Sequence, residues 1–153
     1  MTRCAWFHCF SGIAGDMALG SLIDAGADGD AVLAMLNQLD LPDWELTFEP
    51  VLRGGLAGIK ARVVAHEPHV HRTATDIAAM IEKAQLPSRV TKRALATFWA
   101  LAEVEGRMHN QPPEQVHFHE VGAIDSIIDI VGTCAALESL DIDEIWASAI
   151  TTG

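Results

Sequence analysis

The chain has 153 residues, few of them basic, and no long apolar run. Lys and Arg together number 10, against 21 Asp and Glu, which gives a formal net charge of −11 at pH 7 with histidine neutral. A surface of this charge repels nucleic-acid phosphates, so we exclude a nucleic acid as a partner. No apolar stretch approaches the roughly 20 residues that span a bilayer, so we expect no membrane segment.

Cysteine is also scarce, and we expect no secretion signal. Cys4, Cys9 and Cys134 form no C-x-x-C pair, and a chain of this length folds without disulfides. His8 interrupts the first apolar stretch, and no small-residue cleavage site follows it. We therefore expect reduced thiols and a cytoplasmic protein.

Half of the residues are hydrophobic, and their spacing predicts one α+β domain over residues 1–153. We expect a small mixed β-sheet packed with about five helices. The predicted strands begin at Cys4, Trp44, Ile59, Val116 and Ile145, the first of them buried. The first predicted helix follows Asp16 and ends at Gly26, and the second follows Asp28 or Asp30. The third starts at Thr73 with the capping pattern Thr73-x-x-Asp76, the fourth starts at Ser88, and the last runs from Ala123 to Ser139. Pro68 and the lack of periodicity predict a flexible loop over about 66–72.

Six of the seven histidines fall into two clusters. On a strand, His117 and His119 point to the same side, and imidazole suits nickel, zinc, copper and iron. Glu120 or another histidine would complete such a site, and His109 lies one helical turn after Glu105. The second cluster, His66, His69 and His71, suits metal capture by a loop. An edge strand, a helix end and an ordinary polar loop explain the same residues without a metal.

Carboxylates and small residues form the other candidate site. Asp125 and Asp129 share one face of an otherwise apolar helix, where a buried carboxylate needs a cation, hydrogen-bond donors or a proton. Ser11, Gly12, Gly15 and Asp16 place backbone N–H groups between a strand and a helix, a geometry that binds anions. The segment lacks the Gly-Lys-Ser/Thr end of a P-loop, so Asp16 would bind a metal or a ribose, or simply cap the helix, as Asp125 would.

Two segments together resemble the LarC-type nickel insertion family. They are Cys9–Met17 (CFSGIAGDM) and Val116–Gly132 (VHFHEVGAIDSIIDIVG). The resemblance implies insertion of nickel into a pyridinium bis-thiocarboxylic acid mononucleotide, the precursor of the nickel-pincer cofactor of lactate racemase. It also implies that this chain is the N-terminal part of a longer protein, whose C-terminal part uses CTP with Mn²⁺ or Mg²⁺.

Position by position, the resemblance puts His117, His119 and Glu120 at the catalytic core. His109, Asp16, Asp125 and Asp129 would surround it, and His8 stands where the family has Asp. Forming a nickel–carbon bond on a pyridinium ring releases a ring proton, and a histidine is the natural acceptor. His117 or His119 would be ligand or base, an assignment that the sequence leaves open.

Three functions remain in view. The first is a cofactor-maturation domain that handles nickel and the mononucleotide precursor, whether or not this length of chain is catalytic by itself. The second is a nickel delivery or storage module that depends on His66, His69 and His71. The third is a metal-dependent phosphohydrolase built on Asp16, Asp125 and Asp129. In each case an unpaired strand edge favours a homo-oligomer.

Overall fold

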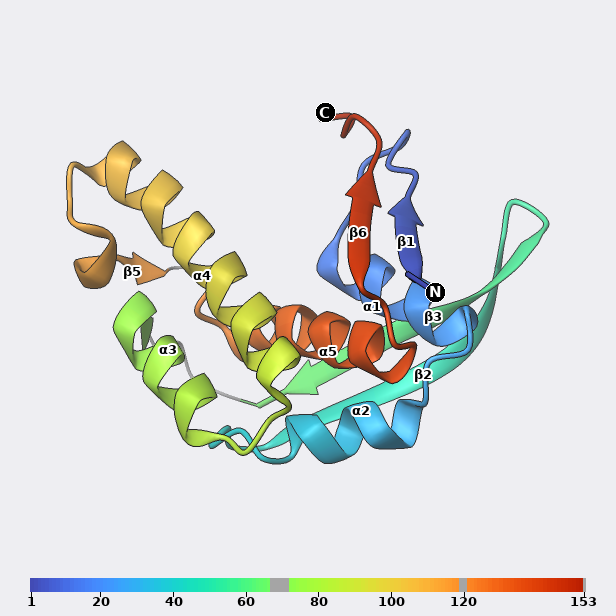
Figure 1. Cartoon of the computed structure of the whole chain (residues 1–153), viewed down its shortest axis with the longest axis horizontal. Helices are drawn as coiled ribbons and strands as arrows, with labels where there is room; N and C mark the ends of the chain where they lie inside the picture. Colours follow the sequence, from blue (N-terminus) through green and yellow to red (C-terminus); the bar gives the residue numbers. More distant parts are fainter. Residues whose placement is uncertain (67–71, 119–120, 153) are drawn as a thin grey trace.

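The computed structural model describes residues 1–66, 72–118 and 121–152. In this part of the chain, five α-helices pack with strands that associate in pairs (Figure 1). The α+β class is therefore confirmed. No helix in the described part combines the length and the apolar character needed to cross a membrane.

The N-terminal part contains one strand and two helices. Strand β1 (Cys4–Phe7) leads through a turn into α1 (Gly15–Asp24), and α2 (Gly29–Leu36) follows. Gly26 has a φ of 102° just after α1, the left-handed conformation that glycine adopts easily at a helix end. Asp28 caps α2, because its carboxylate accepts hydrogen bonds from the backbone N–H groups of Asp30 (3.0 Å) and Ala31 (3.1 Å).

The strands predicted at Trp44 and Ile59 are present and form a hairpin. Strands β2 (Trp44–Arg53) and β3 (Leu56–Ala65) pair antiparallel along their whole length. Gly54 and Gly55 form the two-residue turn, with φ values of 56° and 83° that favour glycine. Helix α1 packs closely on β3, and Gly20 lies at the contact.

The C-terminal part holds the longest helices and three short strands. Thr73 and Asp76 form the predicted capping box at the start of α3. Arg72, which we predict in the loop, instead begins a strand and is buried. The elements are β4 (Arg72–Thr73), α3 (Ala74–Lys83), α4 (Ser88–His109), the 3-10 helix η1 (Pro113–Gln115), β5 (His117–Phe118), α5 (Ile124–Ser139) and β6 (Glu144–Ala147).

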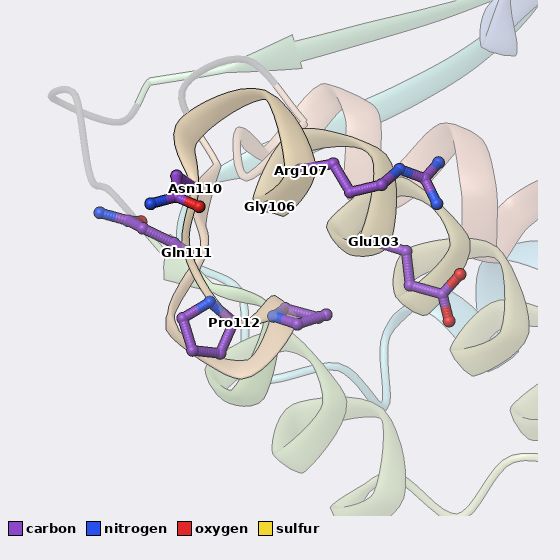
Figure 2. A pocket seen from close by; sticks show the side chains of 7 residues that line it. Glu103, Gly106, Arg107, Asn110, Gln111 and Pro112 are labelled. Carbon is purple, nitrogen blue, oxygen red and sulfur yellow. The ribbon is translucent and has the colours of Figure 1, made fainter.

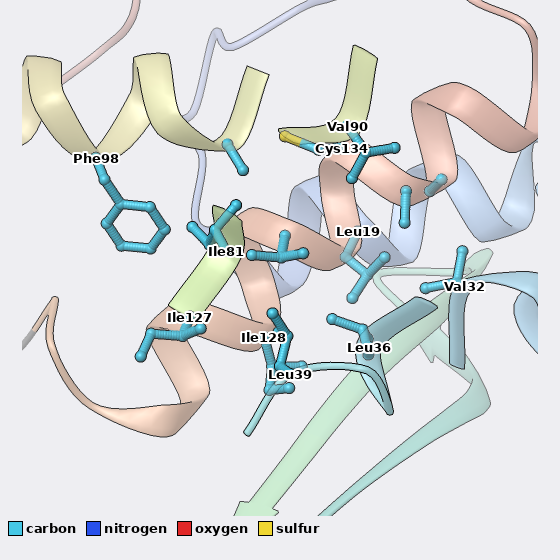
Figure 3. Close-up of a cluster of buried hydrophobic side chains, with 14 of the residues drawn as sticks. Leu19, Val32, Leu36, Leu39, Ile81, Val90, Phe98, Ile127, Ile128 and Cys134 are labelled. Carbon is cyan, nitrogen blue, oxygen red and sulfur yellow. The ribbon is translucent and has the colours of Figure 1, made fainter. Parts of the chain in front are cut away.

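Helix α5 runs through the middle of the core, as its apolar sequence predicts. It contacts α1, α2, α4 and β3. Ile127 and Ile128 of α5 pack with Leu19, Leu36 and Phe98 from the surrounding helices, and all five are fully buried (Figure 3). The elements that carry the candidate site residues are thus fixed against one shared helix.

The strands form three separate pairs rather than one mixed sheet. Strands β1 and β6 are parallel, whereas β2–β3 and β4–β5 are antiparallel. In Figure 1, α5 lies between the β1–β6 pair and the β2–β3 hairpin. This helix takes the space through which a continuous sheet would have to run.

Our expectation that the first strand is buried is wrong. Trp6 and Phe10 are 71% and 70% exposed, and Cys9 is the buried residue of this segment. The reason is that the helices cover one face of β1, where Ala5 and Phe7 pack against the core. Apolar composition alone did not reveal that the other face is uncovered.

Replacing Gly20 tests the contact between α1 and β3. A Cβ atom at Gly20 would come within 2.4 Å of the backbone oxygen of Ile59, so we expect Gly20→Ala to lower the free energy of unfolding by about 2 kcal/mol. A Cβ atom at Gly58 would have no neighbouring atom within 4 Å, so Gly58→Ala is the matched control and should have little effect. Urea denaturation measures both, and equal stability of the two variants would contradict this packing.

Candidate functional site

Strand β5 fixes His117 at the surface. Its register places His117 opposite Thr73 and Phe118 opposite Arg72. His117 is exposed, whereas Phe118 is fully buried and its ring lies 6.3 Å from that of Phe98. The predicted alternation of this segment is thus confirmed for these two residues. His119 and Glu120 lie outside the described residues, so their place beside His117 stays a prediction.

Asp76 stands beside His117 and carries a negative charge. Its carboxylate accepts hydrogen bonds from the Thr73 hydroxyl (2.7 Å) and backbone N–H (2.9 Å). These bonds hold the pKa of Asp76 below its usual value, and the nearby charges of His117 and Arg72 lower it further. The sequence analysis gave Asp76 only a capping role, because nothing in the sequence shows that β5 pairs with the residues before α3.

Arg72 fastens the segment that follows β5. Its guanidinium donates a hydrogen bond of 2.9 Å to the backbone oxygen of Gly122. A Cβ atom at Gly122 would lie 3.0 Å from the backbone oxygen of Phe118, so the backbone at Gly122 approaches the end of β5 closely. Arg72 is therefore a positioning residue for the His117 segment that the sequence analysis missed.

Helix α4 continues through Gly106 and brings Glu105 and His109 onto one face, as predicted. Asn110 ends the helix in the left-handed conformation, with a φ of 53°. The residues after α4 fold back on the helix, so closely that a Cβ atom at Gly106 would lie 2.7 Å from the backbone oxygen of Gln111. A cleft of about 490 Å³ lies at this fold (Figure 2). His109 does not line it. The walls of this cleft offer a metal a single carboxylate, that of Glu103. They are formed by Glu103, Gly106, Arg107, Asn110, Gln111, Pro112 and Pro113.

The remaining loop histidines can be placed only in part. His66 directly follows β3, is exposed, and donates its backbone N–H to the Asp43 oxygen at 3.1 Å. His69 and His71 lie outside the described residues. Over residues 1–66, 72–118 and 121–152, no three His, Cys, Asp or Glu side chains come together as a metal-binding group.

The three predicted aspartates do not form such a group, but they lie close enough for the charges of Asp16 and Asp125 to act on Asp129. Burial, followed by the charges of Asp16 and Asp125, raises the pKa of Asp129 to about 6. Asp129 accepts a hydrogen bond from the backbone N–H of Asp16, and one of its oxygens, Oδ1, is buried with no partner in the described part of the chain. Gly15 allows this approach, because a Cβ atom there would lie 2.6 Å from the Asp129 carboxylate.

The helix start that we predict as an anion site is thus already in contact with a carboxylate of the protein. Asp16 and Asp125 also accept hydrogen bonds of 2.8 Å from the backbone N–H groups of Met17 and Ser126, their own next residues. Both therefore satisfy N–H groups in the first turn of a helix, which is the structural role left open above.

The Ser11–Gly12 turn is tied to the segment after β6. Gly12 has a φ of 85°, and its N–H donates to the Cys9 oxygen at 3.1 Å. The Thr151 hydroxyl donates to the Phe10 oxygen at 2.8 Å, and Cys9 N–H donates to the Ser148 hydroxyl at 2.8 Å. The turn is therefore held in one conformation by residues from both ends of the chain.

Asp16 also lines a cleft of about 350 Å³ between α1 and the β2–β3 hairpin. Met17, Val51, Arg53, Ile59 and Lys60 complete the lining. Neither Arg53 nor Lys60 has an ion-pair partner among the described residues. The arrangement offers two positive charges beside one carboxylate.

The chain is similar to known nickel insertion proteins. Residues 5–153 match the family model described as "Nickel insertion protein". Two proteins named pyridinium-3,5-bisthiocarboxylic acid mononucleotide nickel insertion protein are similar to it. That of Staphylococcus saprophyticus is 46% identical over 100% of this chain and 39% of its own length. That of Desulfitobacterium hafniense is 44% identical over 99% of this chain and 38% of its own length. No solved structure matches.

The chain therefore spans about two fifths of the length of the curated relatives that it matches.

The Asp129 pKa predicts how stability depends on pH. The folded-state value of about 6 lies above the usual 3.8, so the folded state holds more protons between these values, and stability falls as the pH rises from about 4 to 6. Asp129→Asn can still accept the Asp16 hydrogen bond, so it should remove this fall. We expect a gain on the order of 1 kcal/mol at pH 8, reduced by partial exposure, and none near pH 4.

Asp24→Asn is the control, because Asp24 is exposed and its charge, unlike that of Asp125, is not among those that raise the Asp129 pKa. Thermal unfolding at pH 4, 6 and 8 measures all three proteins. A pH profile of Asp129→Asn that runs parallel to that of the unmodified chain would show that Asp129 is not the titrating group.

Proposed function

The chain belongs to the nickel insertion protein family, and on this premise we propose that it binds nickel and the pyridinium-3,5-bisthiocarboxylic acid mononucleotide and takes part in joining them. The observation that carries the proposal is the family match over residues 5–153. The printed names of the relatives supply the metal and the precursor. The chain spans about two fifths of the length of these relatives. That it shares the nickel insertion activity in their names is therefore also proposed.

We place the nickel ligands around strand β5. His117 is exposed there, while buried Phe118 and the bond from Arg72 to Gly122 hold its strand in position. Imidazole nitrogen is a suitable nickel ligand. His119 and Glu120 from the sequence motif, and His109 from the end of α4, are the other proposed participants.

The chemical step assigned to these residues is a proton transfer. A nickel–carbon bond forms on the pyridinium ring as the ring carbon loses its proton, and that proton needs an acceptor. His117 or His119 fills this role, and Asp76, held ionised beside His117, stabilises the positive charge that a protonated imidazole would carry. His66, His69 and His71 are proposed to collect nickel before transfer.

Asp16, Asp125 and Asp129, with Ser11, Gly12 and Gly15, are proposed to bind the precursor. Support comes from the raised pKa of Asp129, because a hydrogen bond from a ribose hydroxyl would stabilise the charged form of this partly buried carboxylate. Arg53 and Lys60, which share a cleft with Asp16, offer charges that a phosphate group would meet.

The family resemblance extends the proposal beyond these residues. We propose that the product serves lactate racemase, that the reaction is of the lyase class, and that it takes place in the cytoplasm. CTP and Mn²⁺ or Mg²⁺ would be bound by the C-terminal domain of the longer family chains, and a homo-oligomer stays a prediction.

Nickel titration tests the proposed ligands. We expect His117→Ala to weaken Ni²⁺ binding at least about ten-fold in a calorimetric titration of the metal-free chain, because each lost ligand removes a coordinate bond. His8→Ala is the control, since His8 is also exposed and lies beside β1, away from β5.

A second variant separates the two nickel roles. If the triple replacement His66→Ala, His69→Ala, His71→Ala abolishes binding and His117→Ala does not, the chain is a nickel delivery module. If neither replacement weakens binding, the assignment of nickel to these histidines is wrong.

A further inference from the structure

The β1–β6 pair carries large apolar side chains in contact with water. Trp6 and Trp146 are partners in the parallel register, so they lie side by side on one face. They are 71% and 58% exposed, and Phe10 and Ile150, beyond the ends of the two strands, are also exposed. Neighbouring exposed apolar side chains of this size are typical of an interaction site, and tryptophan is among the residues that dominate binding energy.

The opposite face is covered on β1 but not on β6, where Ile145 is 47% exposed and Ala147 is also exposed. Ala5 and Phe7 pack against the hydrophobic core. Parallel strands are normally covered on both faces, and two strands alone are a marginal sheet. The Trp6 face therefore has room for one further layer of structure.

The strand edges also have room. Neither β1 nor β6 pairs with a third strand in the described part of the chain. A cleft of about 520 Å³ follows β1 and is bordered by Leu22 of α1 and by Leu140 and Ile142 after α5. Apolar walls beside a strand suit a strand or helix more than a small polar ligand.

The family relatives indicate what occupies this surface. The matched segment is 39% of the Staphylococcus saprophyticus relative, so most of that protein is additional chain. Parallel strands are added through crossover connections, usually helices, which cover the face of the sheet as they return. Two copies related by a two-fold axis would instead pair their edge strands antiparallel.

We propose that the Trp6–Trp146 face of β1–β6 docks the additional chain found in the longer family proteins. That chain supplies an apolar layer over the two tryptophans. The inference rests on family membership and on this surface, and it does not depend on the nickel chemistry proposed above.

The test is a chimera in which this chain replaces the matched 153 residues of the Staphylococcus saprophyticus relative. We expect Trp6→Ser with Trp146→Ser to lower the melting temperature of the chimera by roughly 5 °C or more, because a buried layer is lost. In this chain alone the same pair should shift it by less than about 2 °C, because both residues already face water.

Leu52→Ser with Leu56→Ser is the matched control. These leucines are 72% and 78% exposed at the end of the β2–β3 hairpin, so they should have little effect in either protein. An equal response to the two pairs in the chimera overturns the proposal. So does a rise in the sedimentation coefficient of this chain alone with concentration that the tryptophan pair abolishes, because the occupant is then a second copy.

Hydrogen–deuterium exchange gives an independent measurement that needs no chimera. In the unmodified relative, the peptides aligned with Cys4–Phe7 and Glu144–Ala147 should exchange more slowly in the full-length protein than in its matched segment alone. Equal exchange rates in the two would show that the additional chain leaves this surface open.

Discussion

The burial of helix α5 is the constraint on which the rest of the structure depends. Its apolar residues point in almost every direction, so the helix is stable only when surrounded. Helices α1, α2 and α4 and strand β3 provide that cover, and each meets α5 with its own apolar face. Helix α1 packs directly on α5, and β5 is the element before α5, so both regions that carry candidate site residues are tied to one buried helix.

Asp129 is the exception on this helix, and it connects the core to the loop after β1. A partly buried carboxylate costs free energy unless donors or a cation offset it. Here the Asp16 N–H at the start of α1 is the donor, and Gly15 leaves the space for it. A phosphate that bound at this helix start would have to displace the Asp129 carboxylate. The geometry thus favours a ribose hydroxyl at the aspartates over a bare anion.

Sequence patterns predicted the features that depend only on residues near one another in the chain, such as helix ends and the inward side of a strand. The capping box at Thr73 and Asp76, the glycine after α1, the extent of α5 and the inward side of Phe118 all follow from spacing and side-chain chemistry. Contacts between distant segments were beyond such reasoning. The pairing of Arg72 with the strand of His117, the Asp16 N–H that meets Asp129, and the separation of the strands around α5 all depend on tertiary packing. The exposure of Trp6 was missed for a related reason, since an apolar strand has the same sequence whether one or two of its faces are covered.

The β1–β6 pair joins residues near both ends of the chain, and closing so long a loop is costly in entropy. Polar contacts at its rim help to offset that cost. Arg3 N–H donates to Asp143 at 2.9 Å, and Arg89 binds Glu138, Asp141 and Asp143 around the turn before β6. Exposed ion pairs of this kind contribute little each to stability. The two strands also lack the apolar cover that stabilises most parallel sheets. Ligands of open parallel sheets bind beyond the carboxyl ends of the strands, where the Ser11–Asp16 loop and Ser148 lie. A chain segment docked on Trp6 and Trp146 would therefore supply the apolar cover that the sheet lacks and stabilise it.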